Sequence, residues 1–143
     1  MNYLCESPIF ENSRKEFLIR GIQAYLKGDF LVSIHILIPQ IEAIIRNLAE
    51  KIEVPILKPS RSGGFFYKTL DELLRDPKIA EVLGEDLCLY FRVLLTDPRG
   101  WNLRNDVCHG ISHIEVFNQD TADRVLHALL CLALVKEKNE HCT

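Results

Sequence analysis

Apolar residues recur three and four positions apart along most of the chain, which is the spacing of one face of an α-helix. This pattern predicts a first helix that begins at Asn12 or Ser13 and ends at Gly28. Asp29 is then expected to begin a long second helix over residues 30–52. The segment joining the two helices predicts a tight helical hairpin.

The second helix is predicted to lie at the centre of the core, because its apolar positions cover a wide stripe. Pro39 lies inside it and predicts a kink, since the proline ring clashes with the preceding turn. The apolar positions are Leu31, Ile34, Leu37, Ile38, Ile41, Ile44, Ile45 and Leu48.

The middle of the chain begins with a break in the helical pattern. Residues 53–68 contain two prolines and a Gly-Gly pair, and they predict a loop. Thr69 and Glu72 have the spacing of a capping box, which predicts the start of a short helix. Pro77 suits the first turn of another short helix, which Gly84 is expected to end.

Three further helices are predicted in the second half. They cover residues 85–96, residues 101–110, and a last segment from Asn118 or Asp120 to about Lys138. No convincing β-type alternation appears. The expected fold is all-α, a helical bundle around a long kinked central helix.

Composition narrows the class of protein. With 143 residues the chain suits one domain over 1–143, because two cores would each be too small to be stable. It is 48% hydrophobic and 26% charged, and no apolar run reaches 18 residues, so a soluble globular protein without a membrane segment is expected. The net charge of −3 requires any contact with nucleic acid to come from a local basic surface. Five cysteines, none spaced as CxxC, indicate a reducing, cytoplasmic setting.

The segment "NLRNDVCHG" over residues 102–110 carries the main candidate chemistry. Asn105 and His109 are four apart and share one helical face, and the long side chain of Arg104 can reach the same edge. Histidine transfers protons near neutral pH, and a guanidinium offers paired donors to phosphoryl oxygens. The three residues therefore suit metal-independent cleavage of RNA, in which a 2′-hydroxyl attacks its own phosphate. A structural alternative stays open, in which Arg104 pairs with an acidic neighbour and His109 bonds a backbone carbonyl.

The same segment resembles a known signature. "LRNDVCHG" is similar to the Arg-Asn-x-x-x-His motif of the HEPN superfamily, and the longer "NLRNDVCHG" resembles an uncharacterised HEPN-like family with an NLRN-x-x-x-HG stretch. The likeness covers residues 21–111 and includes "GDFLVSIHILIPQIEAIIRNL", "TLDELL", "VLGEDL" and "LLTDPRGWNLRN".

The resemblance implies a helical bundle that forms a homodimer. It also implies that two copies of Arg104, Asn105 and His109 face a shared cleft, with the arginine and the histidine as the catalytic pair and with no metal or other cofactor. Many members of the superfamily are RNA-cleaving toxins, so a cognate neutralising protein is a possible partner. Many others are not catalytic.

Weaker signals lie outside the motif. The segment "LKPSRSGGFFYK" holds Lys58, Arg61, Lys68 and Tyr67, a set that suits phosphate binding and base stacking, although packing of the aromatic rings is the simpler interpretation. His35, in an apolar stretch, is expected to be an interior or dimer-contact histidine, and it is the best candidate for supporting the site from behind. A zinc site at Cys108, His109 and His113 lacks a fourth ligand, and Cys108 as a nucleophile is disfavoured because its side chain diverges from that of His109.

Two functions therefore follow from the sequence. The first is a metal-independent endoribonuclease of the HEPN type, with His109 transferring protons, Arg104 stabilising the transition state and Asn105 positioning one of them. The second is a non-catalytic module that binds RNA or a nucleotide, or that only dimerises.

Overall fold

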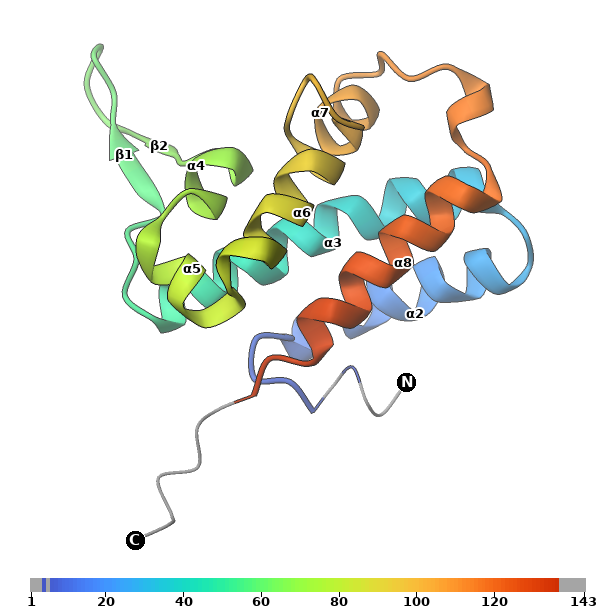
Figure 1. The fold of residues 1–143 in the computed structure, drawn as a ribbon, viewed down its shortest axis with the longest axis horizontal. Helices are drawn as coiled ribbons and strands as arrows, with labels where there is room; N and C mark the ends of the chain where they lie inside the picture. Colours follow the sequence, from blue (N-terminus) through green and yellow to red (C-terminus); the bar gives the residue numbers. More distant parts are fainter. Residues whose placement is uncertain (1–3, 5, 137–143) are drawn as a thin grey trace, which may run out of the picture.

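A computed structural model describes residue 4 and residues 6–136 of the chain. The elements are η1 (Asn12–Arg14), α2 (Lys15–Leu26), α3 (Phe30–Lys51), β1 (Leu57–Pro59), β2 (Phe65–Tyr67), α4 (Leu70–Leu74), α5 (Pro77–Leu83), α6 (Glu85–Leu95), α7 (Leu103–Cys108), η2 (Ile114–Val116) and α8 (Gln119–Ala133). Figure 1 shows the helices gathered in one bundle, from which a hairpin projects. The all-α prediction is confirmed, with this hairpin as a small addition.

The hairpin of α2 and α3 forms where the sequence predicts it. Gly28 follows α2 with a φ of 74°, a conformation that glycine adopts without a steric penalty. Asp29 then begins α3, and its carboxylate accepts a hydrogen bond of 3.1 Å from the backbone N–H of Val32. The two helices approach so closely that a Cβ on Gly21 would overlap the end of the Leu37 side chain. Glycine at position 21 therefore lets the two helices approach closely without displacing the Leu37 side chain.

α3 is the central helix of the bundle and packs against α2, α4, α7 and α8. It is also the one helix among the described residues whose length and composition would suit a membrane span, but 56% of its most apolar window is buried inside the bundle. Its apolar stripe thus forms the core. Pro39 lies within α3 without ending it, and the expected kink stays a prediction. The buried apolar residues of α3 are Ile34, Leu37, Ile38, Ile41, Ile44, Ile45, Leu48 and Ala49.

The short helices begin and end at the residues that the sequence marks. Thr69 and Glu72 form the predicted capping box of α4, with each side chain accepting from the other's backbone N–H. Pro77 opens α5, and Gly84 separates α5 from α6. Asn118 caps α8, which ends at Ala133 and is thus shorter than the predicted helix. The predicted end at Lys138 lies outside the described residues.

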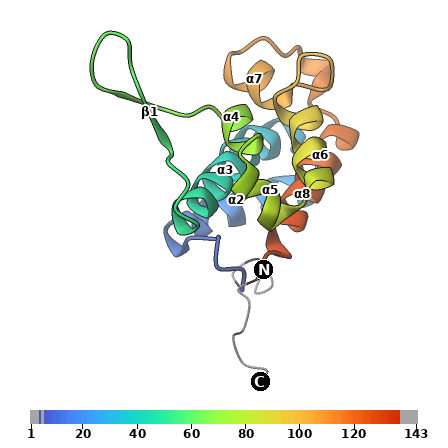
Figure 2. The same cartoon turned by 60° about the vertical axis from the view of Figure 1, so that its left-hand side comes forward.

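The predicted loop over residues 53–68 is in part an antiparallel β-hairpin, and the prediction of no strands is wrong here. Leu57 pairs with Tyr67 and Pro59 with Phe65, and Gly63 and Gly64 supply the positive φ angles of the turn. Figure 2 shows the hairpin standing away from the bundle. Each strand has three residues, too few for an alternation of polar and apolar positions to be recognised.

Candidate functional site

The predicted site residues lie on α7, a short helix at the edge of the bundle. Two side chains anchor α7 to α3 and α6, since Leu103 is 2% exposed and Val107 is 6% exposed. The residues between and beside them, Arg104, Asn105 and His109, remain partly or fully exposed. This division gives α7 a buried face that fixes its position and a polar face that meets solvent.

A chain of side-chain amides holds the start of α7. Asn102 adopts the left-handed conformation with a φ of 49°, which asparagine tolerates better than most residues. Its Nδ2 donates to Asp106 over 3.0 Å, and its Oδ1 accepts from Asn105 Nδ2 over 2.8 Å. Asn105 Nδ2 also lies 3.4 Å from the carbonyl oxygen of Thr96. Asn105 thus joins α7 to the end of α6 and is oriented by its neighbours.

Arg104 is held by an acidic residue from the central helix. Its Nε donates to Glu42 Oε2 over 2.7 Å, and its Nη2 donates to Glu42 Oε1 over 3.4 Å. Its Nη1 donates to Asn105 Oδ1 over 3.2 Å. The hydrogen bond with Glu42 raises the pKa of the Arg104 guanidinium above its ordinary value. The pairing with an acidic neighbour, expected in the structural alternative, is therefore present, and it orients the guanidinium.

His109 ends α7, and its backbone N–H donates to the carbonyl oxygen of Asn105 over 3.0 Å. Its ring is exposed and makes no hydrogen bond with any described residue, so the carbonyl contact of the structural alternative is not found. Arg104, Asn105 and His109 all line one open cavity of about 440 Å³. Thr69, Asp71 and Thr96 line the same cavity, which brings polar groups of α4 and α6 to the motif.

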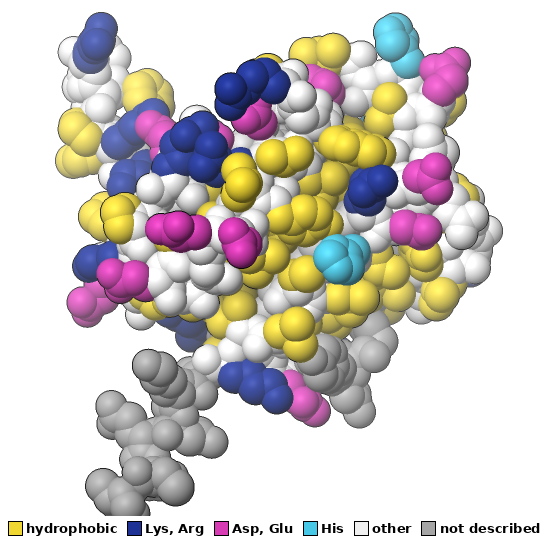
Figure 3. Space-filling view, in the orientation of Figure 1, with side chains coloured by type: hydrophobic (Ala, Val, Ile, Leu, Met, Phe, Trp, Pro, Cys, Tyr) yellow, Lys and Arg dark blue, Asp and Glu magenta, His cyan; other side chains and the backbone are white. Residues whose placement is uncertain are grey.

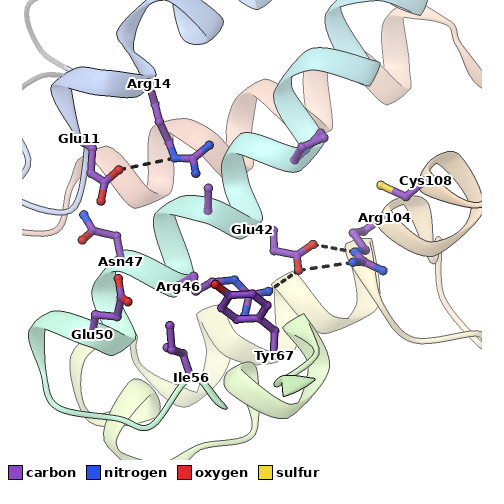
Figure 4. Close-up of a pocket in the computed structure, with 12 residues that line it drawn as sticks. Glu11, Arg14, Glu42, Arg46, Asn47, Glu50, Ile56, Tyr67, Arg104 and Cys108 are labelled. Carbon is purple, nitrogen blue, oxygen red and sulfur yellow. Dashed lines mark hydrogen bonds and ion pairs between the residues drawn. The ribbon is translucent and has the colours of Figure 1, made fainter. Parts of the chain in front are cut away.

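Arg104 also lines a second cavity, of about 520 Å³. Figure 4 shows Arg46 of α3 and Arg104 of α7 directed at the same carboxylate, that of Glu42, with Tyr67 standing beside Arg46. Arg46 Nη2 donates to Glu42 Oε1 over 2.6 Å, and its Cζ lies 5.1 Å from the centre of the Tyr67 ring. Arg104 is the residue that the linings of these two cavities share.

The remaining candidate cations of the hairpin do not gather at the motif. Lys58 pairs with Glu72 over 2.6 Å, and Arg61 lies exposed in the turn of the hairpin. The backbone carbonyl of Lys68 accepts a hydrogen bond from Arg46 over 3.0 Å. Of the four predicted RNA-binding residues, Tyr67 is the one that lines a cavity shared with Arg104.

His35 lies apart from the motif. It is exposed rather than buried, and its ring stacks on Phe117 at 4.7 Å between centroids. Its Nδ1 lies 2.8 Å from the carbonyl oxygen of Leu31, one turn earlier in α3. The expected interior position is wrong, because the apolar residues around His35 in the sequence point to other faces of the helix. The alternative of a dimer contact stays a prediction. Among the described residues, its hydrogen bond and its ring contact are to Leu31 and Phe117, not to the motif.

The chemistry of Cys108 works against a role as a nucleophile. Desolvation raises the pKa of its thiol, and the nearby charge of Arg104 only partly opposes that effect. A raised pKa keeps the thiol protonated near neutral pH, whereas the thiolate is the reactive form.

Within the described residues, no three side chains of the His, Cys, Asp and Glu types lie together in a way that could hold a metal ion.

Sequence reasoning missed how Glu42 and Arg46 relate to the motif. Their spacing of four residues places them on one helical face, where they form an ion pair over 2.6 Å. Nothing in the sequence links them to Arg104, which is 62 positions away from Glu42. The helical packing of α3 against α7 creates that contact.

Comparison of the chain with protein-family models, curated proteins and solved structures found no match in any of the three.

Proposed function

We propose that the protein is a metal-independent endoribonuclease of the HEPN type, with its active site in the cavity lined by Arg104, Asn105 and His109. The observation that carries the proposal is the shared cavity: an exposed imidazole without a hydrogen-bonding partner among the described residues borders the same space as a fixed guanidinium. A charged arginine beside an imidazole that is not hydrogen-bonded suits a reaction in which negative charge develops on a phosphate while the imidazole accepts or donates a proton.

In the proposed reaction, the ring of His109 removes the proton from a ribose 2′-hydroxyl. The 2′-oxygen forms a bond to the adjacent phosphorus, the bond from phosphorus to the 5′-oxygen breaks, and that oxygen takes up a proton. The products are a 2′,3′-cyclic phosphate and a 5′-hydroxyl. Arg104 stabilises the negative charge on the phosphoryl oxygens, and Asn105 positions Arg104 through the hydrogen bond to its Nη1.

The reaction needs a proton donor as well as a base, and we propose that His109 of a second copy supplies it in a homodimer. Figure 3 shows a broad apolar surface over α6 and α8. The exposed apolar side chains of these helices and of the residues that follow them are Leu89, Val93, Trp101, Leu130 and Leu134, each at least 40% exposed. A contiguous apolar surface of this kind is typical of an interface between protein chains.

Polar groups on this surface also favour a second copy as its partner. Arg124 stacks over Trp101 at 4.4 Å, and Tyr90 Oη lies 2.9 Å from His127 Nδ1. Tryptophan, tyrosine and arginine are the residues most often found at the energetic centres of interfaces. Asp123 lines the same cavity as Arg124, so a two-fold axis through this surface can pair unlike charges. The molar mass in solution tests this, and Leu130→Asp is expected to give a monomer.

The test of the enzyme is cleavage of RNA in an excess of chelator. His109→Ala and Arg104→Ala are each expected to lower the rate by about 10²- to 10³-fold. His113→Ala is the matched control, because His113 is exposed and lies outside the cavity. Absence of cleavage by the wild type, or cleavage that survives both substitutions, overturns the proposal.

The second candidate function is a non-catalytic module that binds RNA or a nucleotide. The pairing of Arg104 with Glu42 favours it, since an arginine committed to a carboxylate can serve a structural purpose. Filter binding without turnover, weakening steeply with salt, is the expected result for such a module.

For either function we propose a cytoplasmic location, consistent with the free thiols of Cys88, Cys108 and Cys131.

A further inference from the structure

The cavity between α3, the hairpin and α7 combines features that the cavity at His109 lacks. It has two neighbouring guanidiniums, an exposed aromatic ring and an apolar wall formed by Pro39, Ala43 and Ile56. Its volume of about 520 Å³ lies within the ordinary range for small-molecule sites. We propose that this cavity binds one nucleotide of a single-stranded RNA, next to the phosphate at Arg104. The choice of RNA rests on the proposed function.

The charges favour an anion at one end of the cavity. Arg46 and Arg104 share the carboxylate of Glu42, so these three side chains together carry a net charge of +1. Each guanidinium has five N–H groups. The described hydrogen bonds use two of them on Arg46 and three on Arg104. Donors therefore remain on both arginines, and a phosphodiester can accept them without displacing Glu42.

Tyr67 offers a stacking surface beside this phosphate site. The ring is 64% exposed, and Arg46 covers one of its faces. The other face is left for a base, and stacking on an aromatic ring contributes to the binding of single strands whatever their sequence. The guanidinium under the ring adds a positive charge to the same stack.

The far end of the cavity suits the edge of a base better than a second phosphate. Figure 4 shows Glu50 and Asn47 at the end opposite Arg104, where Arg14 also lies and pairs with Glu11 over 3.6 Å. Asn47 donates its Nδ2 to the carbonyl oxygen of Ile9 over 2.8 Å. Carboxylate and amide oxygens accept hydrogen bonds from the N–H groups of bases, while they repel a phosphate. The polarity of the cavity thus orients the nucleotide with its phosphate toward α7.

The test measures binding separately from cleavage. The probe is a fluorescent six-nucleotide single-stranded RNA with every 2′-hydroxyl methylated, which cannot be cleaved by 2′-attack, and the readout is its dissociation constant by fluorescence anisotropy. Tyr67→Ala is expected to weaken binding by at least about five-fold, while Tyr67→Phe preserves the stack. Arg46→Gln is expected to weaken binding and to reduce the salt dependence by about 0.7 in the slope of log K against log salt.

Two matched variants control for general effects. Phe66 is the neighbouring strand residue, whose side chain points to the opposite face of the hairpin, so Phe66→Ala is expected to bind as the wild type does. Arg20 is an exposed arginine on α2 and lies outside the cavity, so Arg20→Gln controls for the loss of one positive charge. Thermal unfolding of each variant checks that the fold is retained, and exposed Tyr67 can be substituted without disturbing the core.

The outcomes separate this inference from the proposed enzyme. If wild-type protein cleaves no RNA but Tyr67→Ala and Arg46→Gln weaken binding of the probe, the enzyme proposal fails and the nucleotide site stands. If cleavage depends on His109 but both variants bind the probe as the wild type does, the nucleotide site is wrong. Failure of the wild type to bind the probe, or tighter binding of an acidic peptide by the same residues, also overturns it.

Discussion

The interior between α3 and α8 and the polar edge at α7 are held in place by different forces. In the interior, Ile41, Ile45 and Leu129 are fully buried and are fixed by packing alone. At the edge, two buried side chains anchor a helix of six residues, and hydrogen bonds among Glu42, Asn102, Arg104 and Asn105 fix its polar face. Burial of apolar surface supplies stability without regard to direction, whereas hydrogen bonds set the orientation of charged groups. Substitutions should therefore separate stability from orientation.

The largest loss of stability is expected in the interior. Leu129→Ala removes a fully buried side chain and should lower the free energy of unfolding by about 2–5 kcal/mol. Val107→Ala, on the anchoring face of α7, removes less buried surface and should cost roughly 1.5–2 kcal/mol. Urea denaturation of both variants measures the difference. An equal cost at the two positions would contradict the proposed division between interior and edge.

Two glycines test how rigid each region is. A Cβ on Gly100 would overlap the backbone oxygen of Val93, which also accepts from Trp101 N–H over 2.8 Å. A Cβ on Gly21 would instead meet the end of the Leu37 side chain, which can shift. Gly100→Ala should therefore cost about 1–3 kcal/mol, and Gly21→Ala should cost less within that range. Thermal unfolding of the two variants measures both costs in stability. A larger loss for Gly21→Ala than for Gly100→Ala would show that the interior is the more rigid region.

The division also explains how far the sequence predicts the molecule. Helix boundaries follow from local chemistry, so Gly28, Asp29, Thr69 and Asn118 identify them correctly. The sequence also predicts that Arg104, Asn105 and His109 lie together, and they do line one cavity, while their functional roles stay a prediction.

What the sequence does not give is contact across long separations. The pairing of Arg104 with Glu42 arises from the packing of α3 against α7, and no local pattern encodes it. The β-hairpin was not predicted for a related reason. Each strand has three residues, too few to show a pattern, and each strand residue pairs with a residue on the far side of the turn. The prediction of an interior position for His35 was wrong because a residue with apolar neighbours in the sequence can still point outward from a helix.

The carboxylate of Glu42 tests whether orientation at the edge depends on charge. Glu42→Gln keeps the shape but leaves two guanidiniums without their shared anion, and it should cost about 1–3 kcal/mol in the free energy of unfolding. A double-mutant cycle with Arg104→Gln should show coupling, because the two side chains are in direct contact. Arg20→Gln, in an exposed pair with Glu16, is the control and should change stability by less than about 1 kcal/mol. Additive effects of the Glu42 and Arg104 substitutions would contradict the role of this pair.

Substitutions of Asn102 test how the start of α7 is held, and the expected loss of stability for Asn102→Gly is smaller than that of Glu42→Gln. Asn102→Gly retains the left-handed backbone conformation but removes the amide that joins Asn105 to Asp106, and it should cost about 1 kcal/mol. Asn102→Ala loses the same amide and adds the backbone penalty of about 1–2 kcal/mol. Chemical denaturation should rank the alanine variant below the glycine variant. The reverse order would show that the strained backbone matters less than chain flexibility.

The smallest expected effect is a loss of stability at low pH through Glu72, which pairs with Lys58 of the β-hairpin. Hydrogen bonds from Lys58 and from the backbone of Thr69 lower the pKa of Glu72 from its ordinary value of 4.5 to about 2. A carboxyl group with a lowered pKa contributes stability that is fully present above pH 4.5 and is lost as the pH falls toward 2. Glu72→Gln should thus lower the Tm slightly at pH 7, because the Glu72 side chain is well exposed to solvent, and this difference from the wild type should shrink between pH 4.5 and 2. A difference in Tm that stays constant down to pH 2 would show that the charge of Glu72 does not stabilise the start of α4.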